Sequence, residues 1–343
     1  MSKLSSEVSM PRRAVAFDVM SMFHLYSVIA WLTSSEVQSA TIYILRGLNG
    51  EYCCREGVLS ASGKTIVVKH QETGLISNGV VATILNGFYF ILGRFFSSVC
   101  ANHFFIIHHT YFKPSCFRFL SPSQAFNLVP ISFEEGIGSY GDLKHYRDVA
   151  KREGKKLPLL SLMVKKILSI FVRQRFSVLG PKVKVEHADA FRHAVSLVSD
   201  WQVSQDAQIE IAALGLREKN VIIVFMGPYV DMFGVGEKEL SAALTDIKKL
   251  YAGCELLIKP HPLEVKSLKV YDRMGIPRIH SKISGEELIS LVKPKRSIGF
   301  YSGALLVSRN VFGVDFDLLG DIGGKYIMTP SDSIAKLFES RSE

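Results

Sequence analysis

The sequence predicts an α/β fold made of two doubly wound domains with a cleft between them. The 343 residues are enough for two domains, each burying its own core. Short apolar runs alternate with amphipathic stretches, which is typical of parallel sheets with helices on both faces. A charged, weakly periodic region at 182–219 interrupts this alternation. The expected boundary therefore lies near 185–200, with an N-terminal domain at 1–190 and a C-terminal domain at 191–343.

The expected strands are short runs of apolar residues, and the expected helices are stretches with apolar residues on one side. The N-terminal half contains predicted strands at 14–17, 40–45, 65–69, 104–108 and 126–133, and predicted helices at 21–32, 82–99 and 159–173. The C-terminal half contains predicted strands at 220–226, 255–259 and 297–300, and predicted helices at 237–250, 285–291 and 303–310.

Cysteine usage and the N-terminal pattern both indicate a chain that is not secreted. The five cysteines are odd in number and show no C-x-x-C spacing, which argues against a disulfide framework or a zinc site and favours a reducing compartment. The apolar stretch after Arg13 is interrupted by Asp18 and His24, and no small-residue cleavage site stands out. The most apolar segment, 80–107, carries Arg94 and other polar residues, so a buried helix and a strand are expected there rather than a membrane span.

The positive charge is concentrated in one window. The formal net charge is +9, and residues 144–184 hold twelve basic side chains against two acidic ones. The predicted helix at 159–173 is basic and amphipathic, which favours contact with an anionic membrane surface or an anionic polymer. A solvated basic helix with an ordinary buried face remains the alternative, and no motif favours nucleic acid. The candidate surface residues are Lys165, Lys166, Arg173 and Arg175.

The most informative stretch is Lys259-Pro260-His261-Pro262, which ends the apolar run 255–258. Proline fixes its own φ angle and pushes the preceding residue towards extended geometry, so the backbone on both sides of His261 is stiff. Ligands of open α/β sheets bind beyond the carboxyl ends of the strands. A rigidly held histidine beside Lys259 suits an anionic leaving group, although a simple turn with a half-exposed histidine would show the same pattern.

Two adjacent carboxylates, Glu134 and Glu135, follow the predicted strand 126–133 and precede Gly136. A carboxylate whose pKa is raised by its neighbour and by partial burial can act as a general base towards a hydroxyl group. A solvated acidic turn is the simpler interpretation of these two residues alone.

Two predicted helix starts complete the set of candidates. Glu286 lies in the first turn of the helix 285–291, where an acid complements the helix dipole and a fixed carboxylate can also accept hydrogen bonds from ribose hydroxyls. Ser302, between Tyr301 and Gly303, is well placed as an N-cap, and a helix N-terminus also binds phosphate. In a doubly wound sheet such junctions converge on one edge, and together with His261 they describe a nucleotide phosphate site that needs no metal.

The ordered motifs resemble those of bacterial sialyltransferases. Acid-acid-Gly at 134–136, Lys-Pro-His-Pro at 259–262, Ile-Ser-x-Glu at 283–286 and the serine turn at 301–303 look like the lipooligosaccharide sialyltransferases (glycosyltransferase family 52) and the capsular polysialyltransferases. The resemblance implies the GT-B fold, two Rossmann-like domains with the acceptor on the first and CMP-sialic acid on the second. The final helix of such a chain can pack back on the N-terminal domain.

The resemblance also implies roles for individual residues. Glu135 would be the general base, supported by Glu134, and His261 would bind and protonate the departing CMP phosphate. The remaining donor-binding positions would be Lys259, Pro260, Glu286, Ser302, Gly303, Gly227 and Pro228. These enzymes often carry two consecutive hydroxyl residues where this chain has Ser302-Gly303, so part of the phosphate contact rests on a backbone N–H.

With this resemblance, the expected function is that of an inverting, metal-independent sialyltransferase without a cofactor, which uses CMP-sialic acid or a related CMP-linked nonulosonic acid. The expected acceptor is a lipid-linked bacterial surface glycan, lipooligosaccharide or capsule, at the inner face of the cytoplasmic membrane. The alternatives are another CMP-releasing transferase, such as a capsule Kdo transferase or a glycerophosphotransferase, and a degenerate glycan-binding protein. Asp315-Phe316-Asp317 matches a metal-binding D-x-D pattern, and His108-His109 ends a predicted strand, but neither is expected to belong to the site.

Overall fold

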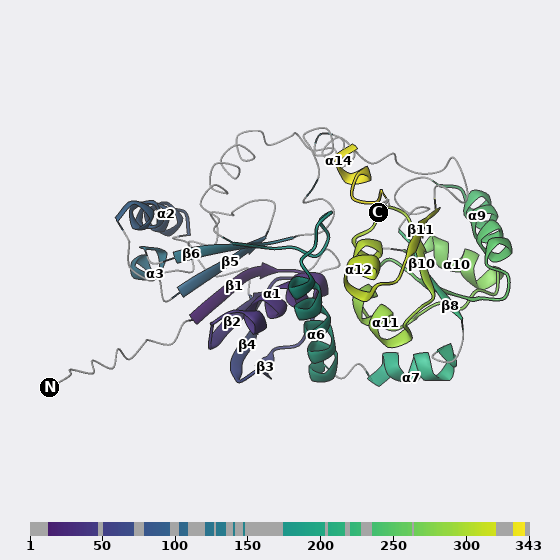
Figure 1. The fold of residues 1–343 in the computed structure, drawn as a ribbon, viewed down its shortest axis with the longest axis horizontal. Helices are drawn as coiled ribbons and strands as arrows, with labels where there is room; N and C mark the ends of the chain where they lie inside the picture. Colours follow the sequence, from purple (N-terminus) through teal and green to yellow (C-terminus); the bar gives the residue numbers. More distant parts are fainter. Residues whose placement is uncertain are drawn as a thin grey trace. The chain divides into compact units, whose positions relative to one another are not determined.

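The computed structural model describes most of the chain, and these residues belong to two compact units (Figure 1). Unit 1 comprises residues 1–133 and 159–176, and unit 2 comprises residues 134–158 and 177–343. The described residues are 13–46, 51–71, 79–96, 103–108, 121–126, 128–134, 140, 147, 174–202, 205–216, 220–227, 235–262, 264–319 and 332–339.

Unit 1 is built on a seven-stranded sheet in the order β3-β4-β2-β1-β5-β6-β7. Its strands are β1 Arg13–Val19, β2 Ser39–Ile44, β3 Gly57–Ala61, β4 Lys64–His70, β5 His103–His108, β6 Leu128–Phe133 and β7 Gln174–Phe176. All neighbouring strands are parallel except β3, which pairs with β4 in antiparallel register. Without the edge hairpin strand β3, the chain order across the sheet is 3-2-1-4-5-6, which is the Rossmann order.

Helix α1, Met22–Ser34, covers this sheet and contacts β1 and β6. Its N-cap is Ser21, whose hydroxyl accepts the N–H of His24 at 3.2 Å. At its other end the ammonium of Lys64 donates to the carbonyl oxygens of Leu32, Thr33 and Ser35. The first residue of β4 therefore satisfies carbonyls that a helix C-terminus leaves without partners.

Helix α2, Gly79–Phe96, packs against α3, Pro122–Phe126, at the edge of unit 1 (Figure 1). The two helices approach very closely at Gly93, because a Cβ atom added there would lie 1.9 Å from the carbonyl oxygen of Phe126. Only glycine permits such an approach between two backbones.

Unit 2 is built on a four-stranded parallel sheet in the order β11-β10-β8-β9. The strands are β8 Val221–Phe225, β9 Glu255–Lys259, β10 Arg296–Gly299 and β11 Phe316–Leu318. An isolated parallel bridge between Ile258 and Arg278 adds a rudimentary fifth position beside β9. With this bridge the chain order is 3-2-1-4-5, again of the Rossmann type.

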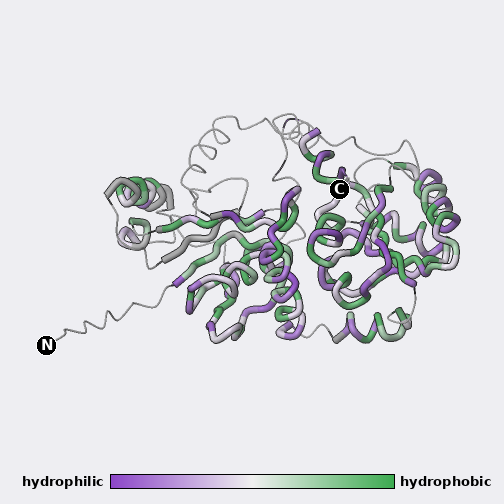
Figure 2. Tube along the Cα trace, in the orientation of Figure 1, coloured by the Kyte–Doolittle hydropathy of each residue, from purple (hydrophilic) through white to green (hydrophobic). Residues whose placement is uncertain are grey.

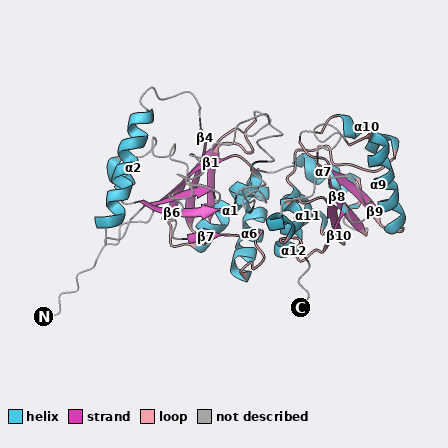
Figure 3. Ribbon diagram, turned by 90° about the horizontal axis from the view of Figure 1, so that it is seen from above, coloured by secondary structure: helices cyan, strands magenta, loops and turns pink. Residues whose placement is uncertain are grey.

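Helices cover both faces of the unit 2 sheet, as Figures 1 and 3 show. On one face α6 (Val185–Gln202), α11 (Gly285–Val292) and α12 (Gly303–Phe312) pack against one another. On the other face lie α9 (Glu237–Leu250) and α10 (Lys266–Arg273), which contact each other. The unit also contains α7, Gln205–Ala213, and α14, Asp332–Ala335.

The core of unit 2 lies between the sheet and these helices. All five residues of β8 are buried, as expected for a central parallel strand with helices on both faces. Figure 2 shows that α9 alternates between apolar and polar residues along its length. The buried cluster includes Ile222, Val224, Leu244, Ile258, Tyr271 and Ile298.

Most predicted elements are present within a few residues of their expected bounds, and α9 and β9 match at both ends. The weakly periodic region 182–219 forms helices α6 and α7, which were not predicted. The expected domain boundary at 190–191 falls inside α6, whose packing on α11 and α12 joins it to unit 2. Strands β3, β7 and β11 and helices α3 and α14 were also not predicted. The predicted helix at 159–173 lies outside the described residues.

The last described helix packs within unit 2. The ring of Phe338, just after α14, contacts the rings of Tyr301 and Phe316. Among the described residues, no helix is long and apolar enough to cross a membrane.

Candidate functional site

The strands of unit 2 end level with one another at one edge of the sheet. Phe225, the last residue of β8, pairs with Lys259 at the end of β9 and with Gly299 at the end of β10. Strand order reverses between β8 and β10, and the crevice at such a reversal is where open α/β sheets bind ligands. His261 lies two residues beyond β9 and Ser302 three residues beyond β10. The ends of β9 and β10 lie on either side of β8, about 10 Å apart at ordinary strand spacing, and the two residues follow these ends.

The His-Pro loop after β9 is held by a buried carboxylate. Glu264 is 6% exposed, and its side chain accepts the backbone N–H of His261 at 2.6 Å and the hydroxyl of Tyr271 at 2.6 Å. The N–H of Glu264 in turn donates to the carbonyl oxygen of His261 at 2.9 Å. A carboxylate with two good donors holds the loop in one conformation, which is the preorganisation that a binding histidine requires.

The two basic side chains of this loop are partly desolvated. Burial lowers the pKa of His261, and the charge of Lys259 lowers it further. Burial also lowers the pKa of Lys259, while the carboxylates of Glu286, Glu264 and Glu210 oppose that shift. An anion bound beside His261 and Lys259 would stabilise the charged form of both side chains and so raise the pKa of each.

Helices α11 and α12 begin close together beside the end of β8. Ser284 caps α11 by accepting the N–H of Glu287 at 3.1 Å, and Ser302 caps α12 by accepting the N–H of Ala304 at 3.1 Å. A Cβ atom added at Gly285 would lie 3.1 Å from the ring of Phe225 and 3.5 Å from the Cβ of Ala304. Two helix N-termini therefore converge at the crevice, and both carry positive partial charge.

Glu286 lies at this point in the first turn of α11 and is 9% exposed. Burial raises the pKa of its carboxyl group, while its own backbone N–H, the Ser284 hydroxyl and the charge of Lys259 oppose the shift. The electrostatic effect of Lys259 on Glu286 connects the loop after β9 with the start of α11. The predicted junction residues His261, Glu286 and Ser302 thus gather at one edge of the sheet, although α11 follows the isolated bridge at Arg278 rather than a full strand.

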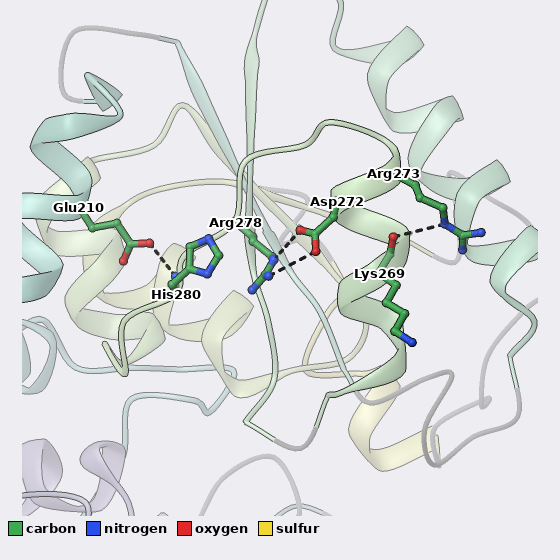
Figure 4. Close-up of polar contacts among 6 residues, drawn as sticks. All are labelled: Glu210, Lys269, Asp272, Arg273, Arg278 and His280. Atoms are coloured by element: carbon green, nitrogen blue, oxygen red, sulfur yellow. Dashed lines mark hydrogen bonds and ion pairs between the residues drawn. The ribbon is translucent and has the colours of Figure 1, made fainter.

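The segment that leads into α11 is fixed by contacts from two helices (Figure 4). The guanidinium of Arg278 donates to both oxygens of Asp272 on α10, at 2.9 and 3.4 Å. Glu210 on α7 accepts the N–H groups of His280 and Ser281 at 2.7 and 3.0 Å. Although burial alone would raise the pKa of Glu210, these N–H donors lower it on balance.

Glu134 is buried rather than open to solvent. Its carboxylate accepts hydrogen bonds from four donors, the hydroxyls of Tyr140 and Ser177 and the N–H groups of Val178 and Leu179. Burial raises the pKa of Glu134, and these four donors oppose the shift. Both oxygens are occupied, so Glu134 fixes the turn that follows β7, and its support of Glu135 stays a prediction.

Several predicted residues lie outside the described part of the chain. They are Glu135, Gly136, Pro228, His109, Lys165, Lys166 and Arg173. Of the rest, Gly227 is buried two residues beyond β8, Gly303 starts α12, and Arg175 is exposed on β7. His108 ends β5 of unit 1.

The D-x-D pattern has a structural explanation. Asp317, on the edge strand β11, accepts hydrogen bonds from the hydroxyl of Tyr251 and from Arg296 at 2.8 Å. Asp315 lies 3.9 Å from the same guanidinium. Among the residues that the structure describes, no group of three or more His, Cys, Asp or Glu side chains could hold a metal ion.

Four described residues that hold the site in place were given no role in the sequence analysis. Glu264 and Tyr271 fix His261, and Ser284 caps α11. The spacing of His261 and Glu264 matches the three-residue reach-back of a capping box, which could have identified Glu264. Glu210 acts across seventy residues, and no local pattern identifies it.

Comparison with solved structures shows the fold. A protein assigned as a UDP-N-acetylglucosamine 2-epimerase from Listeria monocytogenes matches with a TM-score of 0.50 and 12% identity over 97% of this chain and 89% of its own. An α/β-galactoside α-2,3-sialyltransferase from Photobacterium phosphoreum matches with a TM-score of 0.49 and 12% identity over 96% and 95%. UGT71G1 of Medicago truncatula, complexed with UDP-glucose, matches with a TM-score of 0.47 and 10% identity over 89% and 79%.

No family model matches the sequence, and no curated protein matches it. At these identities the structural likeness establishes the architecture, which is an α/β fold of the GT-B type with two Rossmann-like units. The GT-B fold expected from the sequence is confirmed.

Proposed function

We propose that this chain is an inverting, metal-independent glycosyltransferase that moves sialic acid, or a related nonulosonic acid, from a CMP-sugar to a hydroxyl group of a bacterial surface glycan. One observation carries the proposal. The capped N-termini of α11 and α12 converge beside the end of β8, at the strand-order reversal of unit 2, and the charge of Lys259 in the His261 loop acts on Glu286 in the first turn of α11. Such a set of donors suits a phosphate monoester, because it supplies N–H groups, a hydroxyl and an imidazole without a metal.

The donor half of the reaction uses residues of unit 2. The bond between the anomeric carbon and the phosphate oxygen of CMP breaks, and its electron pair stays with the phosphate. His261 and Lys259 stabilise this developing charge, and His261 gives the phosphate a proton. Glu286, buried beside the phosphate subsite, accepts hydrogen bonds from the ribose hydroxyls.

The acceptor half rests on the sequence pattern. The acceptor hydroxyl forms the new bond on the opposite face of the anomeric carbon, so the configuration inverts, and its proton passes to Glu135. Each oxygen of Glu134 already accepts two hydrogen bonds, so a proton taken up by Glu134 would displace donors from one of its oxygens. We therefore assign the role of base to Glu135 and not to Glu134.

The proposed location of the enzyme, at the inner face of the cytoplasmic membrane, follows from its proposed acceptor and its positive charge. A lipid-linked glycan at the inner face of the cytoplasmic membrane fits the basic window 144–184, which would contact the anionic surface. Another CMP-releasing transferase, such as a capsule Kdo transferase or a glycerophosphotransferase, would use the same phosphate subsite. The two differ in the acceptor base, which is a carboxylate in the sialyltransferase proposal.

Thermal unfolding with CMP, CDP, UDP and GDP, in EDTA, tests the donor assignment. A ligand at one hundred times its Kd stabilises the native state by about 2.7 kcal/mol. We expect a rise in Tm with CMP that is lost in His261→Ala and kept in His280→Ala, a matched change at an exposed histidine of the same unit. A shift with UDP or GDP instead, or one that requires a metal, would contradict the proposal, and transfer from CMP-sialic acid that fails with Glu135→Gln would extend it.

A further inference from the structure

Helix α2 of unit 1 presents a cluster of apolar side chains to solvent. Ten large apolar residues are exposed in the described part of the chain, and five of them lie within residues 84–91 of α2. The other five occur singly at other places in the two units. Single exposed apolar residues are normal, whereas a cluster marks an interaction site. We call the cluster the α2 face, and its members are Ile84, Leu85, Phe88, Tyr89 and Ile91.

The α2 face covers a broad side of the helix. At about 100° per residue, its five side chains span an arc of about 160°. The buried residues Asn86, Phe90 and Gly93 lie on the opposite side, where Gly93 meets the backbone of Phe126 on α3. Figures 1 and 3 show α2 at the outer side of the unit 1 sheet. The helix is therefore held by a narrow stripe, and its broad side is left apolar.

The composition of α2 differs from that of an ordinary surface helix, which carries charged and polar residues on its solvent side. Residues 79–93 contain no charged residue, and the hydroxyl of Tyr89 is the only side-chain polar group of the α2 face. No helix that the structure describes meets the length and hydropathy of a membrane span. An apolar face on a helix of this kind suits a position parallel to a lipid surface, at the boundary between headgroups and acyl chains.

The positive charge of the chain is concentrated in the same unit. Unit 1 contains fourteen basic and six acidic residues, a net charge of +8, whereas unit 2 contains twenty-seven basic and twenty-six acidic residues. Such an excess attracts an anionic surface and repels a second copy of the same unit. The charge therefore favours an anionic lipid surface over a dimer formed through the α2 face.

We propose that the α2 face inserts into the headgroup region of a membrane that contains anionic phospholipids. Stable interfacial binding requires two attractions, and unit 1 supplies an apolar contact and a positive charge. The aromatic side chains of Phe88 and Tyr89 suit the level of the headgroups. The inference rests on the proposed function for its biological setting, because the proposed acceptor is linked to lipid. The unit to which the resemblance assigns the acceptor is then the unit that contacts the membrane.

Sedimentation of the full chain with vesicles tests this surface. One set of vesicles contains phosphatidylcholine mixed with anionic phosphatidylglycerol, and the other contains phosphatidylcholine alone. We expect binding to the mixed vesicles and weaker binding to the neutral ones. Salt should weaken the binding to the mixed vesicles without abolishing it, because salt screens the charge and leaves the apolar contact.

Two matched variants locate the contact. Ile84 on α2 and Ile209 on α7 of unit 2 are equally exposed, at 66% each, so replacement of either should leave the fold intact. Ile84→Gln should weaken binding to the mixed vesicles about tenfold, since an aliphatic side chain no longer leaves water on binding. Ile209→Gln should leave the binding unchanged, and urea unfolding checks that both variants are as stable as the wild type.

Phe88→Trp provides a second measurement in the folded chain. Its background is the wild type, in which Trp31 is buried and Trp201 is half-buried. Phospholipids brominated on their acyl chains should quench the introduced tryptophan and leave the wild-type emission unchanged. Without vesicles, iodide should quench the introduced tryptophan, because the α2 face is open to solvent.

Four results would overturn the inference. They are absence of binding to the mixed vesicles, complete loss of that binding in salt, equal effects of the two isoleucine replacements, and protection of the introduced tryptophan from iodide without vesicles. The last result would place another segment or a second copy of this chain on the α2 face, and light scattering with Phe88→Gln would distinguish these two.

The docking surface and the proposed donor fail separately. CMP should raise the Tm of Ile84→Gln as much as that of the wild type, because the candidate nucleotide site belongs to unit 2. If CMP does not bind but vesicle binding still depends on Ile84, the proposed donor is wrong and the docking surface stands. If CMP binds and the vesicles do not, the docking surface is wrong and the donor stands.

Discussion

The carboxylate of Glu264 accepts the backbone N–H of His261 at 2.6 Å while its other oxygen accepts the hydroxyl of Tyr271 at the same distance. Tyr271 is fully buried in the core of unit 2, so the contact connects the His-Pro loop directly to that core. The position of the proposed phosphate-binding histidine is therefore set by a residue that would itself touch no substrate.

Glu264→Gln should weaken CMP binding and lower stability. An amide oxygen can accept from His261 or from Tyr271, but the amide N–H₂ then faces the other donor, which costs about 1–3 kcal/mol for a buried group. Tyr271→Phe is the matched control, because it removes one partner and leaves the His261 N–H paired. Urea unfolding and CMP titration should show lower stability for both variants and weaker CMP binding for Glu264→Gln alone. Equal CMP affinity in wild type and Glu264→Gln would exclude the positioning role.

CMP binding should take up protons through His261. Burial and the charge of Lys259 lower the pKa of this histidine, so it is neutral at pH 7.5 in the free protein, whereas a bound phosphate dianion favours the imidazolium form. Calorimetry at pH 7.5 in two buffers of different ionisation enthalpy measures this uptake. His261→Gln should abolish it, and an unchanged uptake in that variant would assign the proton to another group.

The same lowered pKa affects folding in the opposite sense. The unfolded chain, with an ordinary histidine pKa near 6.5, binds the proton more readily than the native state. The free energy of unfolding should therefore fall as pH drops below about 6.5, and His261→Gln should flatten this part of the stability profile. Urea midpoints measured between pH 5 and pH 7.5 provide the comparison, and saturating CMP should reduce the loss at low pH.

The helices and strands that were predicted correctly are those with a clear hydrophobic pattern in their own residues. The strand predicted at 255–259 and the helix predicted at 237–250 match β9 and α9 at both ends. Helix α6 was missed because its buried face is narrow, with only Ala188, Phe191, Ala194, Val195 and Val198 buried among eighteen residues. Its helical character is decided by packing on α11 and α12, which appears only in the folded chain.

The candidate site was also predicted only in part from the sequence. His261, Glu286 and Ser302 could be selected because strand ends and helix starts are visible in sequence. The contacts that fix them are long-range, such as Glu210 with His280, and depend on tertiary structure. The environment of Glu134 was likewise not visible in the sequence, because the donors that surround its buried carboxylate come mostly from residues 177–179, whereas its supporting role towards Glu135 stays a prediction.

His261→Ala should reduce turnover far more than Ser302→Ala. A donor that stabilises charge in the transition state is worth about 3–4 kcal/mol of barrier, or a factor of roughly 10²–10³ in kcat. The hydroxyl of Ser302 accepts the N–H of Ala304 as an N-cap, so its removal should lower the free energy of unfolding by about 1 kcal/mol. The N–H groups at the start of α12 stay in place. Steady-state kinetics with a CMP-sugar donor, together with Tm values, separate the two effects. Comparable losses of kcat would indicate that the phosphate is held mainly at the α12 N-terminus.

Glu134 and Glu135, adjacent in sequence, should respond in opposite ways to replacement by glutamine. Glu134→Gln places an N–H₂ group against the hydroxyls or N–H groups that now donate to the carboxylate, and it leaves buried donors without acceptors. We expect it to lower the free energy of unfolding by about 2–4 kcal/mol, with any loss of activity following the loss of folded protein. Glu135→Gln should keep the stability of the wild type and lower kcat by about 10²–10⁴, because it removes only the proposed base. Chemical unfolding measures the stability of each variant, and kinetics normalised to the amount of folded enzyme measure its turnover, so the two measurements distinguish a structural role from a catalytic one. If Glu135→Gln unfolds the chain while folded Glu134→Gln loses only turnover, the two roles are reversed, and the buried carboxylate must open to solvent during the reaction.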